Sequence, residues 1–179
     1  MKSTRILLMF AACLPSFVAA QPADPNKVLR YAFEIAETTF DPQKATDVYS
    51  SIVNKGMFDA PVRYDHLARP LKLVPNLLVE MPQISPDYRV YTLKVKPGIY
   101  FADDAAFNGK KRELVAEDFV YTLKRLFDPQ LAANQLGEVE GHIAGTDEWL
   151  ARARKTGKLE FDAPVEGLKA LDRYTFQIK

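Results

Sequence analysis

Hydrophobic and polar residues alternate most clearly in the segment 89–129. Between Val90 and Lys96 the alternation has the period of a strand with one buried face. The apolar face of this strand carries Tyr91, Leu93 and Val95. Pro97-Gly98 favours a turn directly afterwards. The pattern therefore predicts a half-buried strand followed by a tight turn.

A helix is predicted to begin at Ala116, after a polar loop, and to end before Asp128-Pro129. Apolar residues recur in it at helical spacing, and they are Phe119, Val120, Leu123, Leu126 and Phe127. Its charges follow the order that the helix dipole favours. These charges are Glu117 and Asp118 in the first turn and Lys124 and Arg125 in the last. One face of the helix is therefore available for a core.

Shorter elements are predicted on either side of this segment. Strands are expected at 28–33, 62–64 and 79–81. A hairpin turn at 85–88 should lead into the strand that follows. A helix that runs towards Asp59 can be capped by Thr46 or Asp47. Val48, Ile52 and Phe58 lie near one face of that helix.

The C-terminal part of the chain predicts a helix and a last strand. Thr146 can cap the helix, and Gly157 can stop it. Its inward-facing residues are Trp149, Leu150 and Ala153. In the last strand, apolar side chains at 174, 176 and 178 alternate with polar ones.

The first twenty residues predict an export signal. Two basic residues precede the apolar run 6–14, which is too short to span a bilayer and is broken by Pro15. Small residues at Val18-Ala19-Ala20 suit signal peptidase, so we expect cleavage after Ala20 and a flexible lead at 21–27. A membrane anchor would need a longer run. A lipoprotein anchor at Cys13 would need the usual preceding Leu.

Composition narrows the possible functions once this leader is removed. The chain has 24 basic and 23 acidic residues and one cysteine. Because the leader takes Lys2, Arg5 and the cysteine, 22 basic and 23 acidic residues remain. A chain without cysteine has no disulfide, thiolate metal site or cysteine nucleophile. A near-neutral chain has no basic surplus for nucleic acid or an anionic membrane.

Candidate reactive residues lack the context that catalysis or metal binding requires. His66 and His142 have no ligand at metal-binding spacing. Ser50-Ser51 has no nucleophile motif or nearby His. Asp103-Asp104 is typical of a solvated loop, and Gly109-Lys110-Lys111 lacks the rest of a phosphate loop. Trp149 is expected in the core, and no catalytic residue, metal or cofactor is predicted.

The central segment resembles the signature of the family 5 extracellular solute-binding proteins, the oligopeptide and dipeptide receptors of bacterial ABC importers. The matching pieces are Tyr91-Thr92-Leu93-Lys94-Val95-Lys96, Pro97-Gly98, Phe101, Ala116-Glu117-Asp118 and Lys124-Arg125-Leu126. The family usually has a short link after its Phe, where this chain has the longer loop 102–114. It also usually begins the helix with a capping Thr, where this chain has Val115, which cannot cap.

Other segments resemble the same family. They are Leu29-Arg30, Phe40-Asp41-Pro42, Asn54-Lys55-Gly56-Met57-Phe58-Asp59, Leu73-Val74-Pro75-Asn76-Leu77-Leu78 and the segment 167–172. In the family, the loop before the Asp-Pro pair lies at the mouth of the cleft between two lobes and touches the ligand. The resemblance therefore implies that Glu37, Thr38 and Thr39 face the ligand. The alternative is that they are ordinary solvated loop residues and that Phe40 belongs to the core.

The resemblance implies an α/β fold with mixed sheets, in which the chain supplies the first lobe and an inserted subdomain of a two-lobed binding protein. We expect residues 28–45 to form the start of lobe I and residues 46–163 to form the inserted subdomain. A strand at 164–179 is then expected to return the chain to lobe I. Receptors of this family are about three times as long. We therefore expect an N-terminal fragment that lacks the second lobe.

The implied function is periplasmic binding of an oligopeptide or dipeptide and its delivery to an inner-membrane ABC permease, by a monomer without a cofactor. Three alternatives stay open. The first is a receptor of the same fold for haem, a nickel complex or a sugar. The second is an exported hydrolase with a catalytic His downstream, and the third is a structural module that binds no ligand.

Overall fold

The computed structural model describes residue 24 and residues 26–179 of the chain. The predicted leader at 1–20 and the cleavage site after Ala20 lie outside the described residues. The chain divides into two units, one that ends at Phe33 and one that comprises Glu34–Lys179.

The first unit contains no helix or strand in its described part, residues 24 and 26–33. The Lys27 N–H donates to the Asp24 carbonyl at 3.0 Å and closes a turn. The rings of Tyr31 and Phe33 meet edge to face, with centroids 5.3 Å apart. The predicted strand at 28–33 is wrong, because no described segment of this unit pairs with it and an unpaired strand is not stable in water.

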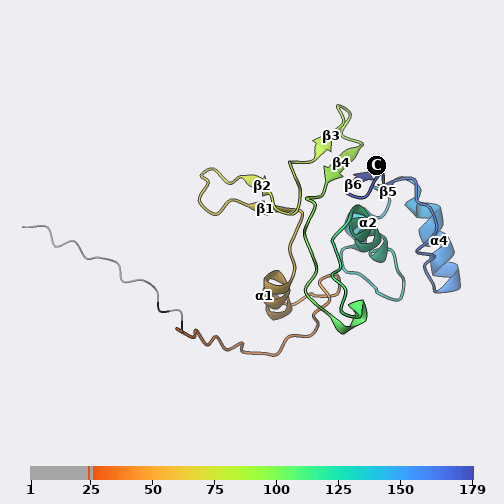
Figure 1. The fold of residues 1–179 in the computed structure, drawn as a ribbon. Helices are drawn as coiled ribbons and strands as arrows, with labels where there is room; N and C mark the ends of the chain where they lie inside the picture. Colours follow the sequence, from red (N-terminus) through yellow and green to blue (C-terminus); the bar gives the residue numbers. More distant parts are fainter. Residues whose placement is uncertain (1–23, 25) are drawn as a thin grey trace, which may run out of the picture. The chain divides into compact units, whose positions relative to one another are not determined.

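The second unit contains a four-stranded antiparallel sheet in the order β3-β4-β6-β5 (Figure 1). Its strands are β3 (Gln83–Ile84), β4 (Tyr91–Lys94), β5 (Leu168–Ala170) and β6 (Thr175–Ile178). The register of the middle pair places Leu93 opposite Phe176. The predicted turn at 85–88 joins β3 to β4. A separate antiparallel pair is formed by β1 (Val62–Tyr64) and β2 (Leu73–Pro75).

The helices of this unit are α1 (Val48–Met57), the 3-10 helix η1 (Ala105–Phe107), α2 (Ala116–Arg125), α3 (Leu136–Val139) and α4 (Thr146–Thr156). Three predicted features are confirmed. Helix α1 is capped by Asp47, α2 begins at Ala116, and Gly157 ends α4 with a left-handed φ of 68°. Such a positive φ is a conformation that glycine adopts without strain.

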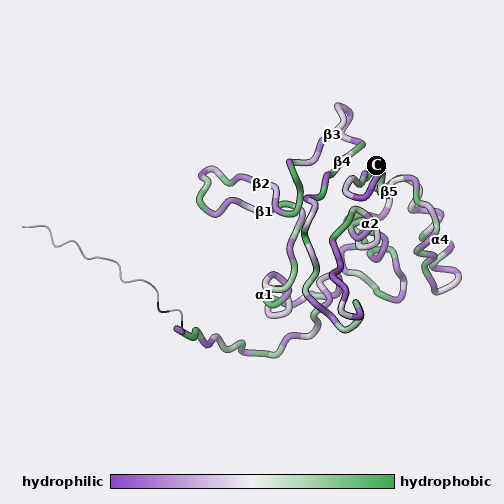
Figure 2. The backbone as a smooth tube through the Cα atoms, viewed as in Figure 1, coloured by the Kyte–Doolittle hydropathy of each residue, from purple (hydrophilic) through white to green (hydrophobic). Residues whose placement is uncertain are grey.

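Helix α2 packs on the sheet and supplies much of the core. The ring of Phe119 stacks on that of Phe176 in β6, with centroids 4.9 Å apart. At the other end of the helix, Phe127 contacts Trp149 of α4 with ring centroids 5.8 Å apart. The tube of α2 carries both hydrophobic and hydrophilic parts (Figure 2). The predicted apolar face of α2 and the predicted burial of Trp149 are therefore confirmed.

Two predicted elements differ from the structure. The strand expected at 79–81 lies at Gln83–Ile84 instead. Val79 still donates to the Lys94 carbonyl, but the chain then bends and reaches Pro82, which has no N–H to donate. Thr146 does not cap α4, because the capping position is held by Gly145 and the Thr146 hydroxyl donates to the Ile143 carbonyl.

Gly167 marks a close approach between the last strand and the segment before α4. Its N–H donates to the Ala144 carbonyl at 2.7 Å, and its carbonyl accepts from the Lys179 N–H at 2.9 Å. A Cβ at this position would lie 2.6 Å from the Lys179 carbonyl oxygen and 2.7 Å from the backbone of Ala144. Only glycine fits here without moving backbone.

None of the helices found in residue 24 and residues 26–179 has the length and apolar character needed to cross a membrane.

Candidate functional site

The loop that contains Glu37, Thr38 and Thr39 is attached to the start of α1. The buried Ser50 hydroxyl accepts from the Thr38 N–H at 2.9 Å and from the Thr39 N–H at 3.3 Å. The Thr38 hydroxyl donates to the Asp47 carboxylate at 2.6 Å. These bonds fix the backbone of Thr38 and Thr39 against one helix.

The following part of the same loop is attached to α2. Asp41 Oδ2 pairs with Nη2 of Arg125 at 2.6 Å. Gln43 donates its side-chain amide to the Thr122 carbonyl at 2.8 Å. The segment 34–43, which we call the bridging loop, is therefore bonded to α1 through Thr38 and Thr39 and to α2 through Asp41 and Gln43.

The two motif segments that resemble the family meet at this loop. Asp41 comes from the Phe-Asp-Pro segment, and Arg125 comes from the Lys-Arg-Leu segment at the end of α2. The residues on either side of Asp41 are exposed to solvent. Phe40 is 52% exposed, and Pro42 is also exposed. Phe40 is therefore not a core residue, which corrects one of the alternatives drawn from the sequence.

Two hydroxyl groups of the bridging loop already form hydrogen bonds within the chain. The Thr38 hydroxyl hydrogen is used on Asp47, and the Thr39 hydroxyl accepts from the Asp41 N–H at 3.1 Å. The half-buried carboxylate of Glu37 has no hydrogen-bond or ion-pair partner among the described residues. The backbone N–H groups of 34–37 also make no hydrogen bond within the described chain. A carboxylate and main-chain N–H groups of this loop thus have no partner among the described residues.

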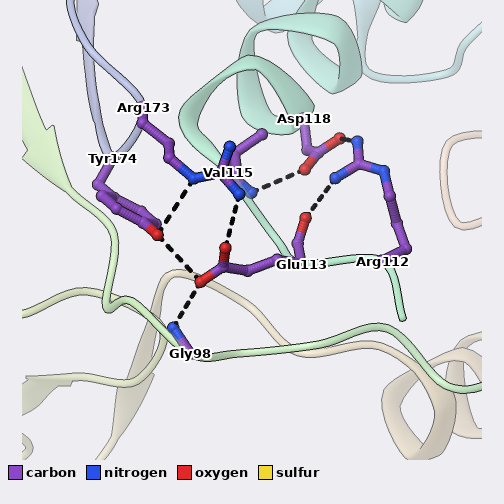
Figure 3. Close-up of polar contacts among 7 residues, drawn as sticks. All are labelled: Gly98, Arg112, Glu113, Val115, Asp118, Arg173 and Tyr174. Carbon is purple, nitrogen blue, oxygen red and sulfur yellow. Dashed lines mark hydrogen bonds and ion pairs between the residues drawn. The ribbon is translucent and has the colours of Figure 1, made fainter. Parts of the chain in front are cut away.

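A second polar cluster lies between β4 and α2 and is centred on Glu113 (Figure 3). Glu113 Oε1 accepts from the Gly98 N–H at 2.8 Å and from the Tyr174 hydroxyl at 3.0 Å. Glu113 Oε2 pairs with the Arg173 guanidinium at 2.7 Å. Hydrogen bonding to Arg173, followed by that to Gly98, lowers the pKa of Glu113. These contacts favour the ionised carboxylate, which ties the Pro-Gly turn to the last hairpin.

The start of α2 is held by the same cluster. Asp118 Oδ2 accepts from the Val115 N–H at 2.8 Å, and Asp118 also pairs with Arg112. The Ala116 N–H donates to the Arg173 carbonyl at 2.9 Å. Asp118 thus satisfies a backbone donor of the first turn, which compensates for the missing capping Thr. The motif residues Ala116 and Asp118 are structural here, and Glu117 is exposed.

Phe101, the remaining motif residue, lies in the loop between the turn and α2. Its ring contacts that of Phe107 in η1, with centroids 6.3 Å apart, and the Arg112 guanidinium lies 5.5 Å from its centroid. Its N–H donates to the Arg112 carbonyl at 2.9 Å. Phe101 is nevertheless 43% exposed. The longer loop 102–114 is therefore a folded hairpin-like segment.

The described residues contain no group of three His, Cys, Asp or Glu side chains that could hold a metal ion. His66, His142, Asp103 and Asp104 are exposed. The Ser50 hydroxyl is buried and engaged by the loop, so it is a hydrogen-bonding group in this structure. Sequence reasoning treated Ser50 only as a possible nucleophile. The predicted cap at 46 or 47 was the signal that could have led to it.

Comparison with known proteins places this chain in a family. The family model described as bacterial extracellular solute-binding proteins, family 5 Middle, matches residues 72–179. The periplasmic oligopeptide-binding protein OppA of Salmonella typhimurium is 27% identical over 169 residues, which are 94% of this chain and 27% of that protein. Di/tripeptide-binding protein 2 of Pseudomonas aeruginosa is 31% identical over 136 residues, which are 73% of this chain and 23% of that protein.

A solved structure has a similar fold over most of this chain. Haemophilus influenzae OppA, in complex with the peptide RPPGFSPFR, superposes with a TM-score of 0.58 at 26% identity over 80% of this chain and 25% of that chain. The present chain spans about a quarter of the length of the relatives that it matches.

The mixed α/β fold and its assembled motif segments define part of a two-lobed extracellular solute-binding protein. The chain belongs to family 5 of the bacterial extracellular solute-binding proteins, because the family model matches more than half of its length. The resemblance stated from the sequence is thereby confirmed.

Proposed function

We propose that this chain acts within a periplasmic receptor that binds an oligopeptide or dipeptide and delivers it to an ABC-type importer. The single observation that carries the proposal is the family 5 match over residues 72–179. The matched relatives named above are peptide-binding proteins by their own descriptions. Because the chain spans only about a quarter of their length, the function belongs to the complete receptor.

The bridging loop is the part of the chain that we assign to ligand binding. Its free groups, the Glu37 carboxylate and the main-chain N–H groups of 34–37, suit a peptide, which offers an ammonium group and a row of carbonyl oxygens. Recognition through main-chain groups makes little use of the peptide's side chains, so selectivity for sequence should be loose. A ligand must also favour the closed arrangement of two lobes if the permease is to detect it.

We retain the expected organisation as part of this proposal. In it, the start of lobe I is formed by residues 28–45 and the inserted subdomain by residues 46–163. The strand at 164–179 returns the chain to lobe I. The mature protein begins at Gln21, acts as a monomer and docks on an inner-membrane permease. The intact mass of the product released from the periplasm of its host tests the export part. A mass that still includes the leader contradicts cleavage after Ala20.

Calorimetric titration of the complete gene product tests the ligand class. We expect saturable binding of RPPGFSPFR or of tri-alanine, and recovery of the bound peptide intact by mass spectrometry. Cleavage of the peptide would favour the hydrolase alternative. Binding of haem, a nickel complex or a sugar without binding of either peptide would replace the peptide with that ligand. No binding of any of these probes would support a structural module.

A further inference from the structure

We propose that Ser50 and Asp47 are positioning residues of the ligand site, which preset the backbone of Thr38 and Thr39 before a ligand arrives. The inference rests on the proposed function, because it treats the bridging loop as a ligand-binding segment. Neither residue needs to touch the ligand. Their role is to set where the neighbouring free groups of the loop lie.

Ser50 makes the central contacts. Its side chain is completely buried, and its Oγ accepts from two successive backbone donors, the N–H groups of Thr38 and Thr39, at 2.9 and 3.3 Å. A hydroxyl oxygen has two acceptor lone pairs, and here both have a donor. Successive N–H groups of an extended chain point to opposite sides. Two of them converge on one oxygen only where the chain bends sharply, so the contact specifies a local conformation.

Asp47 supplies a second contact from the same helix start. Its Oδ1 accepts from the Ser50 N–H at 2.7 Å, which is the capping bond of α1, and its Oδ2 accepts from the Thr38 hydroxyl at 2.6 Å. One carboxylate therefore holds both the helix and the loop. Hydrogen bonding, above all to Ser50, lowers the pKa of Asp47 to about 2, so the carboxylate is ionised at neutral pH.

The placement of these bonds connects them to ligand binding. Thr38 and Thr39 directly follow the segment 34–37, whose main-chain N–H groups are free within the described chain, and Glu37, whose carboxylate is also free there. Fixing a loop in its bound conformation raises affinity because less conformational entropy is lost on binding. Without the Ser50 contacts, the ligand itself would have to order the loop.

The chain provides a matched control at the next position. Ser51 is also a serine of the first turn, but its hydroxyl donates to the Asp47 carbonyl at 2.9 Å and makes no bond to the loop. Val120 provides a control for stability alone. It is buried in α2 and belongs to the core, so Val120→Ala should lower the free energy of unfolding without altering the loop.

Amide hydrogen exchange in the complete gene product tests the structural half of the inference. With no ligand present, we expect Ser50→Ala to speed exchange of the Thr38 and Thr39 amides by about tenfold or more, because each loses its acceptor. Ser51→Ala and Val120→Ala should leave these two amides unchanged relative to the rest of the chain. Unchanged exchange in Ser50→Ala would overturn the inference.

Calorimetric titration with RPPGFSPFR and with tri-alanine tests the functional half. We expect the Kd of the peptide that binds the wild type to rise about tenfold in Ser50→Ala, and to stay within about twofold in Ser51→Ala and Val120→Ala. Equal affinity of wild type and Ser50→Ala would overturn the positioning role and leave the proposed function standing. If Ser50→Ala and Val120→Ala lost affinity for the peptide equally, the effect of Ser50 on binding would come only from its contribution to the stability of the fold. Failure of the wild type to bind either probe would overturn both proposals.

Discussion

Asp41 and Arg125 form an ion pair at 2.6 Å although 84 positions separate them in the sequence. The aspartate lies in the bridging loop, and the arginine lies in the last turn of α2. Both side chains are partly buried, with exposed fractions of 24% and 31%. The pair therefore fixes the far end of the candidate ligand loop to the helix that covers the sheet.

This pair should contribute measurably to stability. We expect a double-mutant cycle with Asp41→Asn and Arg125→Met, followed by urea unfolding, to give a coupling free energy of about 1 kcal/mol, the upper end for pairs of this exposure. The pair Arg154–Glu140, with exposed fractions of 55% and 38%, is the control. Its coupling should be about 0.3 kcal/mol or less. Equal coupling for both pairs would contradict the view that the loop depends on its bond to α2.

Because other backbone atoms lie so close to Gly167, adding a single methyl group there should strongly lower the stability of the fold. Gly167→Ala places a Cβ within 2.7 Å of backbone atoms of Lys179 and Ala144, and backbone cannot rotate away as a side chain can. We expect the free energy of unfolding to fall by about 3 kcal/mol.

Gly137→Ala is the control for this effect, because a Cβ there would meet nothing within 4 Å. That variant, in helix α3, should be neutral or stabilising by up to about 1 kcal/mol. Both changes can be measured by urea unfolding of the same preparation. A neutral Gly167→Ala would mean that β6 and the segment before α4 do not approach as closely as described.

The buried amide of Asn54 predicts a stabilising substitution. Asn54 is 5% exposed, and neither its side-chain nitrogen nor its oxygen has a hydrogen-bond partner in the described structure. A buried polar group without a partner costs about 1–3 kcal/mol. We expect Asn54→Leu, which has a similar shape, to raise the free energy of unfolding by about 1 kcal/mol.

The control for Asn54 is Asn134→Leu. The Asn134 amide donates to the Lys44 carbonyl at 3.0 Å, so its replacement should be destabilising or neutral. Thermal unfolding of the two variants gives the comparison. A lower Tm for Asn54→Leu would show that the amide has a partner in the complete protein.

Asp47 predicts a dependence of stability on acid pH. Its pKa is lowered from 3.8 to about 2, chiefly by hydrogen bonding to Ser50. A carboxylate with a lower pKa in the folded state stabilises the fold above its unfolded-state pKa, and this stabilisation is lost as the pH falls through the folded-state pKa. The wild type should therefore lose stability between about pH 4 and about pH 2 more steeply than Asp47→Asn.

Urea unfolding at a series of pH values measures this difference in slope. Asp162→Asn, which removes a negative charge from an exposed position, should keep the wild-type slope. If the slopes of wild type and Asp47→Asn were equal, the carboxylate would not hold the loop and helix in the ionised form.

Local patterns determined the elements whose neighbours lie close in sequence. The helical spacing of apolar residues at 119–127 predicted α2, and the charges at its ends and Asp128-Pro129 predicted its limits. The alternation around Leu93 predicted β4, and the Asp47 cap predicted the start of α1. These predictions succeeded because capping, the helix dipole and side-chain periodicity act over a few residues.

Elements that depend on a partner were less predictable. The segment 28–33 has a strand-like composition, but it has no partner strand within its described unit. Thr146 has the chemistry of a cap, but its hydroxyl bonds to Ile143 and Gly145 takes the capping position. The first segment lacks a partner strand among the described residues, and at Thr146 a neighbouring residue takes the capping position, so the local preference alone did not decide either outcome.

The sequence by itself determined the family, the main helix and the main strand. Only the tertiary structure decided that Asp41 meets Arg125, that Glu113 joins the Pro-Gly turn to the last hairpin, and that Ser50 holds the bridging loop. Periodicity records which face of an element is buried and not which residue lies opposite it. Polar contacts between distant segments depend on the packing of the whole core, so they become visible only when the chain is folded.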